Sequence, residues 1–315
     1  DDGLQTIQCD LPLLVCVTEG VAPELYPDRD QMERAEGISF EEVSAADLSS
    51  DLSQFGSEGS PTWVDEIRLV EPKRLGILLE ESTPEDAAKQ AADALWQRLA
   101  ELAHEAGDAA EPITLPRYPD SKDQSIWVVA ENTHQGLAAV THEMLGKARE
   151  LTQYTKSEVV AVLIAPQNEE IVTELATQAA DRVLVLDNSE LGPVCGMAVG
   201  NSFAEAVSKE SPYAILFAST ADGRDLASRL AARLKLGLTG DANDLEIDDE
   251  GRLVQLKPAL GGNVVAPILS KTLPNLVTLR PGLLTPAAPE PGAAAIVEQI
   301  PALPYNGPDV RLLKE

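Results

Sequence analysis

The chain has 315 residues, 44% of them apolar and 4% aromatic, a length that suits two domains with an ample core. Its 52 acidic residues outnumber 24 basic ones, and the formal charge of −28 leads us to expect neither nucleic acid nor a membrane surface as a partner. No apolar run has the length of a membrane-spanning helix, and no basic stretch followed by an apolar one opens the chain, so cytoplasm or an organelle matrix is the expected location.

The first third of the chain predicts exposed segments rather than a closed domain. Ile7–Val17 is an apolar run interrupted by Pro12, typical of a strand with one irregular point. Ile38–Val43 partly alternates, as an exposed strand would. The segments Val21–Glu36 and Ser44–Gly59 are polar or small, and we expect loops there.

An extended arm and one long helix follow. The arm consists of Ser60–Val64 and Ile67–Pro72. Thr83 can cap a helix with Pro84 at its first position, and a face of alanine and leucine continues to about Glu105. Because an extended arm cannot form a core alone, we predict that arm and helix wrap onto the domain that follows.

Strands and helices alternate after residues 107–124, a segment rich in proline, aspartate and alanine that we interpret as a linker. The expected strands are Ile126–Ala130, Val159–Ile164, Arg182–Leu186 and Ala214–Ala218, and the expected helices are Leu137–Gln153, Glu169–Ala180, Met197–Lys209 and Arg224–Leu236. Such alternation requires right-handed crossovers and a mostly parallel sheet with helices on both faces. We therefore predict an α/β fold, a three-layer αβα sheet of the nucleotide-binding, Rossmann-like kind.

The pattern changes after Leu238. Short strands are expected near Leu245–Ile247, Leu253–Lys257, Asn263–Ile268 and Asn275–Leu279. From Pro281 the chain is rich in proline and alanine, and we expect an extended tail.

The stretch Tyr213–Glu246 contains a strand, a turn and a helix, the unit of a parallel sheet. Thr220 or Asp222 can cap the helix, and Gly237 can end it. A helix N-terminus in this place can attract phosphate, but neither GxGxxG nor GxxxxGK[ST] is present. The residues alone therefore favour turn and cap roles for Thr220, Asp222 and Gly223.

Several motifs in this stretch resemble the signature of electron transfer flavoprotein α subunits. They are Thr220–Ala227, Arg229–Leu234, Gly237–Asp241 and Asn243–Leu245. Further matches occur in the family's order between Ser125 and Gly282, at Trp127–Glu131, Lys147–Leu151, Gly261–Val264 and Leu279–Gly282. The signature residues to which we assign structural roles are Gly223, Arg224, Arg229, Arg233, Asp241, Asp244, Gly262 and Asn263.

The resemblance suggests that Arg229 and Arg233 face a packed or subunit-facing surface, where Asp241, Asp244 and Glu246 could pair with them. Removing one partner of a buried pair leaves the other charge stranded. On this hypothesis Arg233→Gln destabilises the domain by more than about 2 kcal/mol. On the alternative, a solvated helix face, replacing both arginines costs no more than about 1 kcal/mol.

The first third is similar to the C-terminal part of electron transfer flavoprotein β subunits. The shared motifs are Ser44–Leu48, Gly59–Thr62, Pro72–Arg74 and Pro84–Ala88. A β subunit fused ahead of an α subunit would give this order. The domains would then be a β-like portion at 1–106, a linker at 107–124, and an α-like α/β domain with a C-terminal extension at 125–315.

The resemblance implies an electron carrier component rather than an enzyme, one that passes electrons from flavin dehydrogenases to an acceptor such as a quinone oxidoreductase. It implies FAD in the complete protein, with AMP as a second nucleotide. The family holds its FAD in a further domain, and the chain ends at Glu315 without motifs for one. We therefore expect a scaffold without the redox domain, which does not bind FAD alone. Its partners would be a FAD-binding domain in cis or in trans and the remainder of the β subunit, and the resemblance carries over no catalytic residue.

One loop of the β-like portion corresponds to the family's docking site for partner dehydrogenases. The family has a leucine anchor there, followed by lysines, whereas here Asp28 stands near the leucine position and Glu33 near the lysines. Leu25 and Tyr26 could be a shifted anchor, and Met32 completes the set of docking candidates. An exposed polar loop without a partner is the open alternative.

Two other classes remain open from the sequence. A nucleotide or small-ligand binding module of the same fold would have no redox role. An adenylating enzyme needs a phosphate loop rich in glycine and serine after its first strand, where Glu131–Gly136 has a single glycine and no serine. We rank the enzyme last.

No metal site is expected. The cysteines lie among apolar neighbours without a CxxC spacing, so we predict buried free thiols at Cys9, Cys16 and Cys195. The histidines lie far from them in the sequence and complete no ligand pattern.

Overall fold

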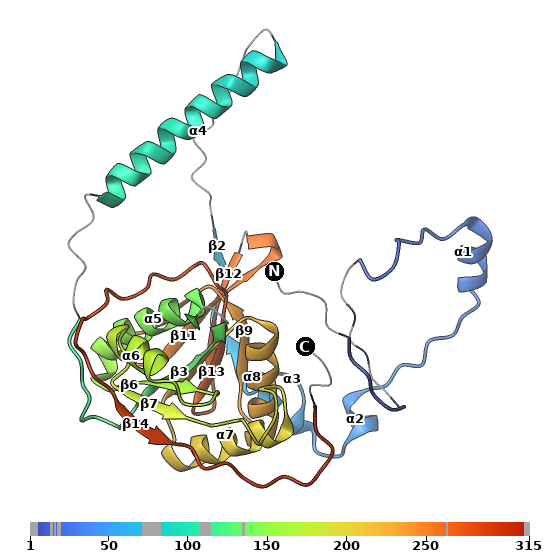
Figure 1. Ribbon diagram of the computed structural model, residues 1–315. Helices are drawn as coiled ribbons and strands as arrows, with labels where there is room; N and C mark the ends of the chain where they lie inside the picture. Colours follow the sequence, from blue (N-terminus) through green and yellow to red (C-terminus); the bar gives the residue numbers. More distant parts are fainter. Residues whose placement is uncertain are drawn as a thin grey trace. The chain divides into compact units, whose positions relative to one another are not determined.

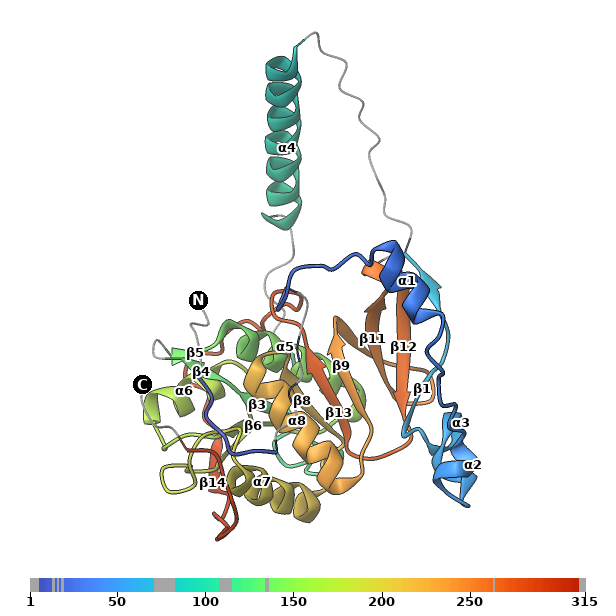
Figure 2. The ribbon, with the colours of Figure 1, turned by 90° about the vertical axis from the view of Figure 1, so that its right-hand side faces the viewer.

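The computed structural model describes residues 6–12, 15, 17, 20–70, 83–107, 115–133, 136–262 and 264–311, with only the backbone for 102–107. The chain divides into two compact units, Asp1–Leu52 and Ser53–Glu315 (Figure 1). The second unit contains both large sheets and the layered core (Figure 2).

The described part of the first unit contains two short helices and no buried residue, α1 (Arg29–Ala35) and α2 (Ala45–Leu48). A capping box starts α1: the Gln31 amide donates to Asp28 Oδ1 at 2.8 Å, and the Asp28 amide donates to Gln31 Oε1 at 2.9 Å. This cap explains why part of the loop expected at 21–36 is helical.

The strands expected at Ile7–Val17 and Ile38–Val43 are wrong, because the described residues of both ranges are irregular. Their apolar side chains have no cover: Ile7 is 81% and Phe40 87% exposed. A strand needs a partner for its backbone amides, and apolar composition does not supply one. Cys9 is exposed rather than buried for the same reason, and Cys16 lies outside the described residues.

The second unit opens with the extended arm and the long helix. These elements are η1 (Leu52–Gln54), α3 (Gly56–Gly59), β1 (Thr62–Val64), β2 (Arg68–Leu69) and α4 (Pro84–Gly107). The α/β elements that follow are β3 (Ile126–Ala130), β4 (Asn132–Thr133), β5 (Gly136–Leu137), α5 (Ala139–Thr155), β6 (Val159–Leu163), α6 (Glu169–Thr177), β7 (Arg182–Val185), α7 (Met197–Glu210), β8 (Ala214–Ala218) and α8 (Ala221–Leu234). The last group comprises β9 (Leu238–Ala242), β10 (Asp244–Ile247), β11 (Leu253–Ala259), η2 (Leu260–Gly262), β12 (Val264–Ser270), β13 (Asn275–Leu279) and β14 (Ile296–Gln299).

The main sheet has seven strands in the order β14-β7-β6-β3-β8-β13-β9, and every neighbouring pair is parallel. This confirms the predicted α/β fold with a parallel sheet. Three of its strands were not assigned to it from the sequence. β13 was expected as a short strand of unknown sheet, while β9 and β14 were not expected at all.

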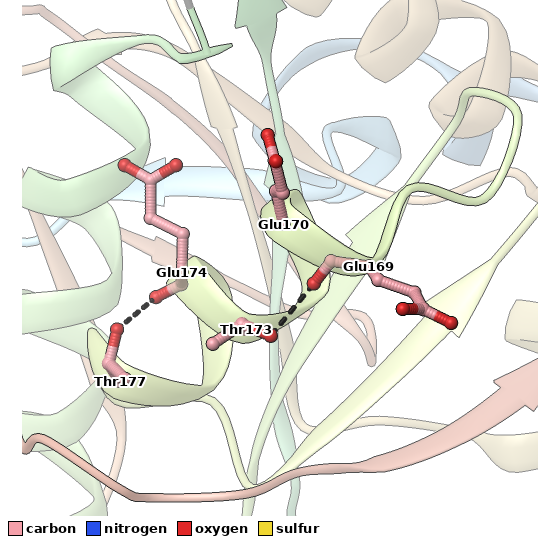
Figure 3. A pocket seen from close by; sticks show the side chains of 5 residues that line it. All are labelled: Glu169, Glu170, Thr173, Glu174 and Thr177. Carbon is pink, nitrogen blue, oxygen red and sulfur yellow. Dashed lines mark hydrogen bonds between the residues drawn. The ribbon is translucent and has the colours of Figure 1, made fainter.

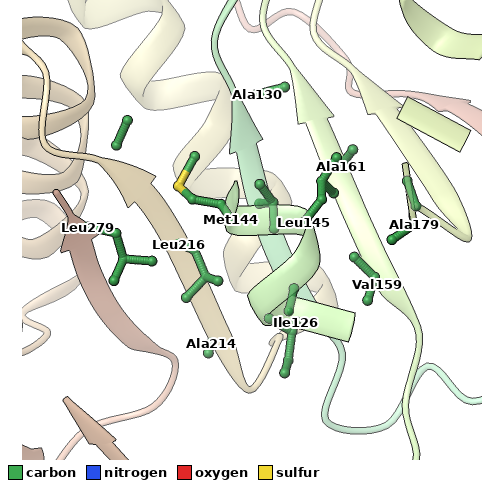
Figure 4. Packing of buried hydrophobic residues seen from close by; sticks show 14 of the residues in the cluster. Ile126, Ala130, Met144, Leu145, Val159, Ala161, Ala179, Ala214, Leu216 and Leu279 are labelled. Carbon is green, nitrogen blue, oxygen red and sulfur yellow. The ribbon is translucent and has the colours of Figure 1, made fainter. Parts of the chain in front are cut away.

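Helices cover both faces of the main sheet, which gives the three layers (Figures 1 and 2). On one face α5 and α6 enclose a core that includes Ile126, Met144, Leu145 and Leu216 (Figure 4). On the other face α7 and α8 enclose a second core that includes Phe203. Strands buried on both sides must be apolar throughout, which is why β3, β6 and β8 were recognisable as continuous apolar runs.

The second sheet is antiparallel, in the order β1-β12-β11-β10, with β2 also paired to β12. Thr62 lies opposite Ser270, and Leu69 lies opposite Val264. The arm therefore adds two short strands to the sheet of the α-like part, which confirms that it wraps onto this domain.

The long helix α4 forms as expected from its capping residue and its alanine-rich face. Its apolar side chains Leu95, Trp96 and Leu99 are exposed. Cover for this face by the rest of the protein stays a prediction.

The described end of the expected linker, 115–124, contacts the α/β body. Arg117 donates from Nη1 to Ala180 O at 3.0 Å and from Nη2 to Ala176 O at 2.8 Å, close to the end of α6. The Gln153 side chain donates to Pro116 O at 3.0 Å. These residues are ordered parts of the body.

Gly237 lets the arm pass close to the body. A Cβ atom at this position would lie 2.7 Å from Thr62 Cγ2 and 2.9 Å from Pro61 O. Side-chain contacts of that length do not occur, so a larger residue here must displace the arm or β9.

A buried arginine holds together the amino edge of the main sheet. Arg182 on β7 is 1% exposed, and its guanidinium lies 2.7 Å from Glu158, 2.7 Å from Glu210 and 2.8 Å from Glu298. Burial would lower the pKa of Arg182, but hydrogen bonds to the three carboxylates raise it above its ordinary value. Burial raises the pKa of the Glu158 carboxyl, against the effect of Arg182 and of Lys122.

Next to this cluster, a second buried pair joins α5 to the start of β7. Arg149 Nη2 lies 2.7 Å from Asp181 Oδ2, and both side chains are at most 2% exposed. The same Asp181 oxygen accepts the Val159 amide at 2.9 Å. Arg117 lies 3.6 Å from the other Asp181 oxygen, so two arginines neutralise this carboxylate.

We expect Gly237→Ala to loosen the arm, because overpacking of this kind costs about 1–3 kcal/mol and the arm is held by short pairings. Trypsin should then cut at Arg68 faster than in the unchanged protein, as followed by mass spectrometry. Gly240→Ala is the matched control, since a Cβ atom at Gly240 meets no atom within 4 Å. Equal cleavage rates in the two variants would show that Gly237 does not position the arm.

We expect Arg182→Met to lower the free energy of unfolding at pH 7 by about 3–5 kcal/mol, because Glu158 would stay buried without a cation. The native pKa of Glu158 would then lie further above its unfolded value of 4.5, so the native state would bind more protons than the unfolded state. The loss of stability should therefore shrink as the pH falls from 7 towards 5, as measured by urea titration.

The matched control is Arg252→Met, because Arg252 also pairs with two acids, Asp248 and Glu250, but is 45% exposed. Its stability should change by no more than about 1 kcal/mol. A loss in Arg182→Met as small as that of the control would refute the importance of the buried cluster.

Candidate functional site

Successive strands are added to one side of β3 and then to its other side, so the strand order of the parallel sheet reverses between β3 and β8. From β3 it passes through α5 to β6 and then to β7 on one side, and α7 brings it back to β8 on the other side. In open α/β sheets, ligands bind at such a point, outside the carboxyl ends of the strands. The candidate site therefore consists of Glu131, which follows β3, and Ser219 and Thr220, which follow β8.

A carboxylate of the protein itself fills this position. Thr220 Oγ1 donates a hydrogen bond to Glu131 Oε1 and accepts one from the Gly223 amide at 3.1 Å, which caps α8. The backbone of Glu131 is also fixed: its amide donates to Thr141 Oγ1 at 2.9 Å, and its carbonyl accepts from the Ala138 amide at 2.8 Å. Glu131 thus links β3, the start of α5 and the start of α8.

Gly223 allows α8 to approach the end of β8. A Cβ atom at this position would lie 2.2 Å from Ala218 O and 3.1 Å from Glu131 Oε1. No side chain fits there, so Gly223 has a packing role in this structure.

The charge at the site opposes a bound anion. Burial raises the pKa of the Glu131 carboxyl, and Asp222 raises it further, while the hydrogen bond from Thr220 acts in the opposite direction. A phosphate group at the N-terminus of α8 would meet the Glu131 carboxylate in its place and the Asp222 charge beside it. In this arrangement the charges of Glu131 and Asp222 therefore disfavour an anion such as a pyrophosphate group at the N-terminus of α8.

Arg224 and Asp241, two of the signature residues, form an ion pair next to this crevice. Arg224 Nε lies 3.0 Å from Asp241 Oδ1, and the Asp241 amide donates to Thr278 Oγ1 at 2.9 Å. Burial alone would raise the pKa of the Asp241 carboxyl, but hydrogen bonds from Arg224 and Ser219 and the charge of Arg280 hold it below its ordinary value. The pair connects α8 to β9.

Asp244, a third signature residue, connects β10 to α5. Lys147 Nζ lies 2.8 Å from Asp244 Oδ1 and 2.8 Å from Glu150 Oε2. Burial alone would lower the pKa of Lys147, but the two carboxylates raise it above its ordinary value. Lys147 therefore stays charged and joins the antiparallel sheet to the main body.

The pairing expected for Arg229 and Arg233 is wrong. Arg229 pairs with Asp225 on its own helix at 2.6 Å, and Arg233 is exposed. The expected partners pair elsewhere: Asp241 with Arg224, Asp244 with Lys147, and Glu246 with Arg68. A spacing of four places the two arginines on one helix face, but it does not say which element that face meets.

Gly262, another signature residue, lies at the tip between β11 and β12. Its φ is +88° and that of Gly261 is +69°, in the left-handed region that favours glycine. Leu260 beside them is 79% exposed. Asn263 lies outside the described residues.

The docking candidates of the first unit are exposed. Leu25 is 91%, Tyr26 83% and Met32 56% exposed. Asp28, by contrast, is engaged as the N-cap of α1. A docking role for this loop stays a prediction.

Sequence reasoning missed Glu143 as a positioning residue. Its carboxylate, on α5, accepts the Gly282 amide at 2.9 Å and the Leu284 amide at 3.3 Å, which holds the segment after β13. Gly146, one turn further along α5, lets the same segment pass, because a Cβ atom there would lie 2.4 Å from Thr285 O. The sequence pattern that could have indicated this role is an acidic residue and a glycine within the apolar face of a predicted helix.

The shallow hollows of the described surface include the following two. The first, of about 540 Å³, is lined by Glu169, Glu170, Thr173, Glu174 and Thr177 of α6 (Figure 3). Both of its hydroxyl groups donate to carbonyl groups of the same helix, at 2.8 and 2.9 Å, and its carboxylates would repel an anion. The second, of about 930 Å³, lies between residues 188–193 and 302–311.

Neither a metal-binding cluster nor a membrane-spanning helix is found among the described residues. None of their histidine, cysteine, aspartate and glutamate side chains gather into a group that could hold a metal ion. Within the same residues, no helix is both long and apolar enough to cross a membrane. Cys195 is half-buried, and burial raises the pKa of its thiol.

Because Arg233 is exposed, we now expect Arg233→Gln to change the free energy of unfolding by no more than about 0.5 kcal/mol. Lys147→Gln is the contrasting variant, since the Lys147 side chain is 10% exposed and its charge-assisted hydrogen bonds to Asp244 and Glu150 would be lost, at a cost of about 1–3 kcal/mol. Urea midpoints of the two variants decide between the surface and the packed interpretation. A larger loss of stability for Arg233→Gln than for Lys147→Gln would show that Arg233, and not Lys147, lies at a packed site.

Comparison with known proteins agrees with the fold. The family profile described as the electron transfer flavoprotein domain matches residues 126–304. This range runs from the first strand of the main sheet to the segment beyond β14.

Curated relatives each match about half of the chain. Electron transfer flavoprotein subunit alpha of Thermoanaerobacterium thermosaccharolyticum is 39% identical over 166 residues, 52% of this chain and 50% of that protein. The protein of the same name in Clostridium acetobutylicum is 36% identical over 162 residues, 51% of this chain and 48% of that protein. Lactate dehydrogenase (NAD(+),ferredoxin) subunit LctC of Acetobacterium woodii is 36% identical over 168 residues, 53% of this chain and 40% of that protein.

The chain thus spans about half the length of the curated relatives it matches. The matching part contains the main sheet, the crevice filled by Glu131 and the ion pairs of Arg224 and Lys147. Since the electron transfer flavoprotein domain covers more than half of its residues, the chain belongs to the electron transfer flavoprotein family.

Proposed function

We propose that this chain is the α/β scaffold of an electron carrier whose flavin is held by a separate FAD-binding domain, in cis or in trans. The carrier would pass electrons from flavin dehydrogenases to an acceptor such as a quinone oxidoreductase. The names of the relatives support a role in electron transfer. The chain would be a carrier component rather than an enzyme in its own right.

The observation that carries this proposal is the carboxylate in the crevice between β3 and β8. A nucleotide-binding module of this fold would hold its phosphate there, at the N-terminus of α8. Glu131 takes that position and is hydrogen-bonded to Thr220. The geometry therefore favours a scaffold over the alternative, a nucleotide or small-ligand binding module without a redox role.

The remaining partners follow from the family and are part of the proposal. The arm pairs with β12 inside the α-like part, which supports a fused arrangement of a β-like portion at 1–106 and an α-like domain at 125–315. The remainder of a β subunit, with its AMP, would complete the assembly. The loop with Leu25 and Tyr26 would be the docking candidate for dehydrogenases, in the cytoplasm or an organelle matrix.

The first test compares the chain alone with the intact protein. We expect the purified chain to lack a flavin band near about 450 nm, because its crevice is filled. The intact protein, isolated from its natural source with an antibody against this chain, should show that band and lose it on reduction. FAD bound to the chain alone would refute the scaffold role, and an intact protein without flavin would refute the electron carrier.

A second test addresses the binding-module alternative by calorimetric titration with AMP and with FAD. We expect no binding to the unchanged chain or to Glu131→Gln, which removes the charge but keeps an acceptor for Thr220. Glu205→Gln, an exposed position on α7, controls for the change in net charge. Micromolar binding of AMP to Glu131→Gln alone would favour a nucleotide module closed by this carboxylate.

A further inference from the structure

The C-terminal strap, defined as residues 288–311, is attached to the α/β body mainly through polar groups. Among its residues only Ile300 is buried, at 6% exposure, whereas Ile296 is 56% and Val297 38% exposed. Apolar burial is the main force that holds elements of a fold in place. The strap therefore buries little apolar surface.

Three carboxylates of the strap bind hydrogen-bond donors on segment 115–124, on β7 and on α7. Glu290 accepts from Arg117 Nε at 2.9 Å, just before β14. Glu298, within β14, lies 2.8 Å from Arg182 and 3.7 Å from Lys122. The attachments run along the edge of the sheet beside β7.

The third carboxylate, Asp309, caps a helix far from it in sequence. It accepts the Met197 amide at 2.7 Å and the Ala198 amide at 2.9 Å, at the N-terminus of α7. Gly196 leaves room for the Asp309 carboxylate, because a Cβ atom at this position would lie 3.2 Å from Asp309 Oδ1. The same strap forms one wall of the hollow of about 930 Å³ described above.

Backbone hydrogen bonds also attach the strap: β14 pairs with β7 over Ile296–Gln299, and the Glu290 amide donates to Thr177 O at 2.8 Å. The Ile296 amide donates to Asp181 O at 3.0 Å, the Ile300 amide to Val185 O at 2.8 Å, and the Leu303 amide to Ser202 Oγ at 2.9 Å. β14 has a single neighbour in the sheet, β7. An edge strand with little apolar cover opens at a lower free energy than the centre of the sheet.

We propose that residues 288–311 form an ionic strap, which detaches from the α/β body as one unit while the body stays folded. Detachment uncovers the N-terminus of α7 and the edge of β7, and it removes a wall of the hollow. The device depends on charge, so salt and acid release it.

The direction with pH follows from the groups that face each carboxylate. Glu298 faces Arg182 and Lys122, and hydrogen bonds from Arg182 hold its pKa below the ordinary value of 4.5. Asp309 faces the amides of α7 and the charge of Arg229, which outweigh its burial and hold its pKa below 3.8. A lowered carboxyl pKa stabilises the attached state above these values, and that contribution is lost as the pH falls below about 4.5.

Neighbouring acids do not reverse this direction. Glu158 and Glu210 share Arg182 with Glu298, and burial raises the pKa of Glu158. Glu158 therefore takes up its proton first as the pH falls, while Glu298 is still ionised. Arg117 contacts both Glu290 and Asp181 and therefore lies between two carboxylates.

The test is hydrogen exchange at neutral pH on the full chain, with the amides of Ile296, Ile300 and Leu303 reporting on the strap. The central amides of β3 and β8 report on the body. Glu298→Gln and Asp309→Asn weaken two separate anchors of the strap, and Glu205→Gln, at an exposed position on α7, is the matched control. Loss of a charge-assisted hydrogen bond should speed exchange of the strap amides about tenfold and leave the body amides unchanged.

Hydrogen exchange at raised salt is a second readout. Salt should change the exchange rates of the strap and of the body in opposite directions. Raising the ionic strength from about 0.1 to 1 M shortens the Debye length from about 10 to 3 Å. It should speed exchange in the strap while slowing it in the body, whose excess negative charge repels itself. The proposal fails if strap and body amides change by one common factor in the variants or in salt, or if neither variant speeds the strap.

Discussion

The buried charge of Arg182 constrains how the chain can fold at the amino edge of its main sheet. An arginine and a glutamate that are each 1% exposed lose several kcal/mol of hydration, and only close, well-oriented partners offset that loss. The partners of Arg182 come from the residue before β6, from α7 and from β14, so these three parts of the chain must converge on β7. A register slip of β14 would move Glu298 to the other face of the sheet and leave the cluster incomplete.

At the opposite edge, the chain's own polar groups cap the N-termini of α6, α7 and α8, whereas α5, with Ala138 as its N-cap, has no side-chain cap. The N-terminus of α8 is capped by Thr220, which also binds Glu131, and that of α7 is capped by Asp309. The first turn of α6 is capped by Asn168. Free helix N-termini attract phosphate because their amides have no partner. The internal caps on α6, α7 and α8 leave fewer free amides for an anion at this edge.

How far the sequence predicts this structure depends on what each element needs. Strands such as β3 and β8 are continuous apolar runs because both faces are buried, so their pattern identifies them. β14 lies at an edge among prolines and takes its stability from Arg182, which no local pattern records. The candidate site, likewise, could be predicted from the sequence only in part. A turn with Thr220 and Gly223 is visible, but the carboxylate that fills the crevice comes from Glu131, 89 residues earlier.

Both sheets are completed by segments that lie far from their neighbours in sequence. The arm supplies β1 and β2 to the antiparallel sheet, and the tail supplies β14 to the parallel one. Both additions form on edges, where few apolar contacts are available, and each uses a specific device instead. For the arm this device is the missing side chain of Gly237, and for the tail it is the buried charge of Arg182. The arm and the antiparallel sheet that it joins therefore lie in one compact unit, Ser53–Glu315.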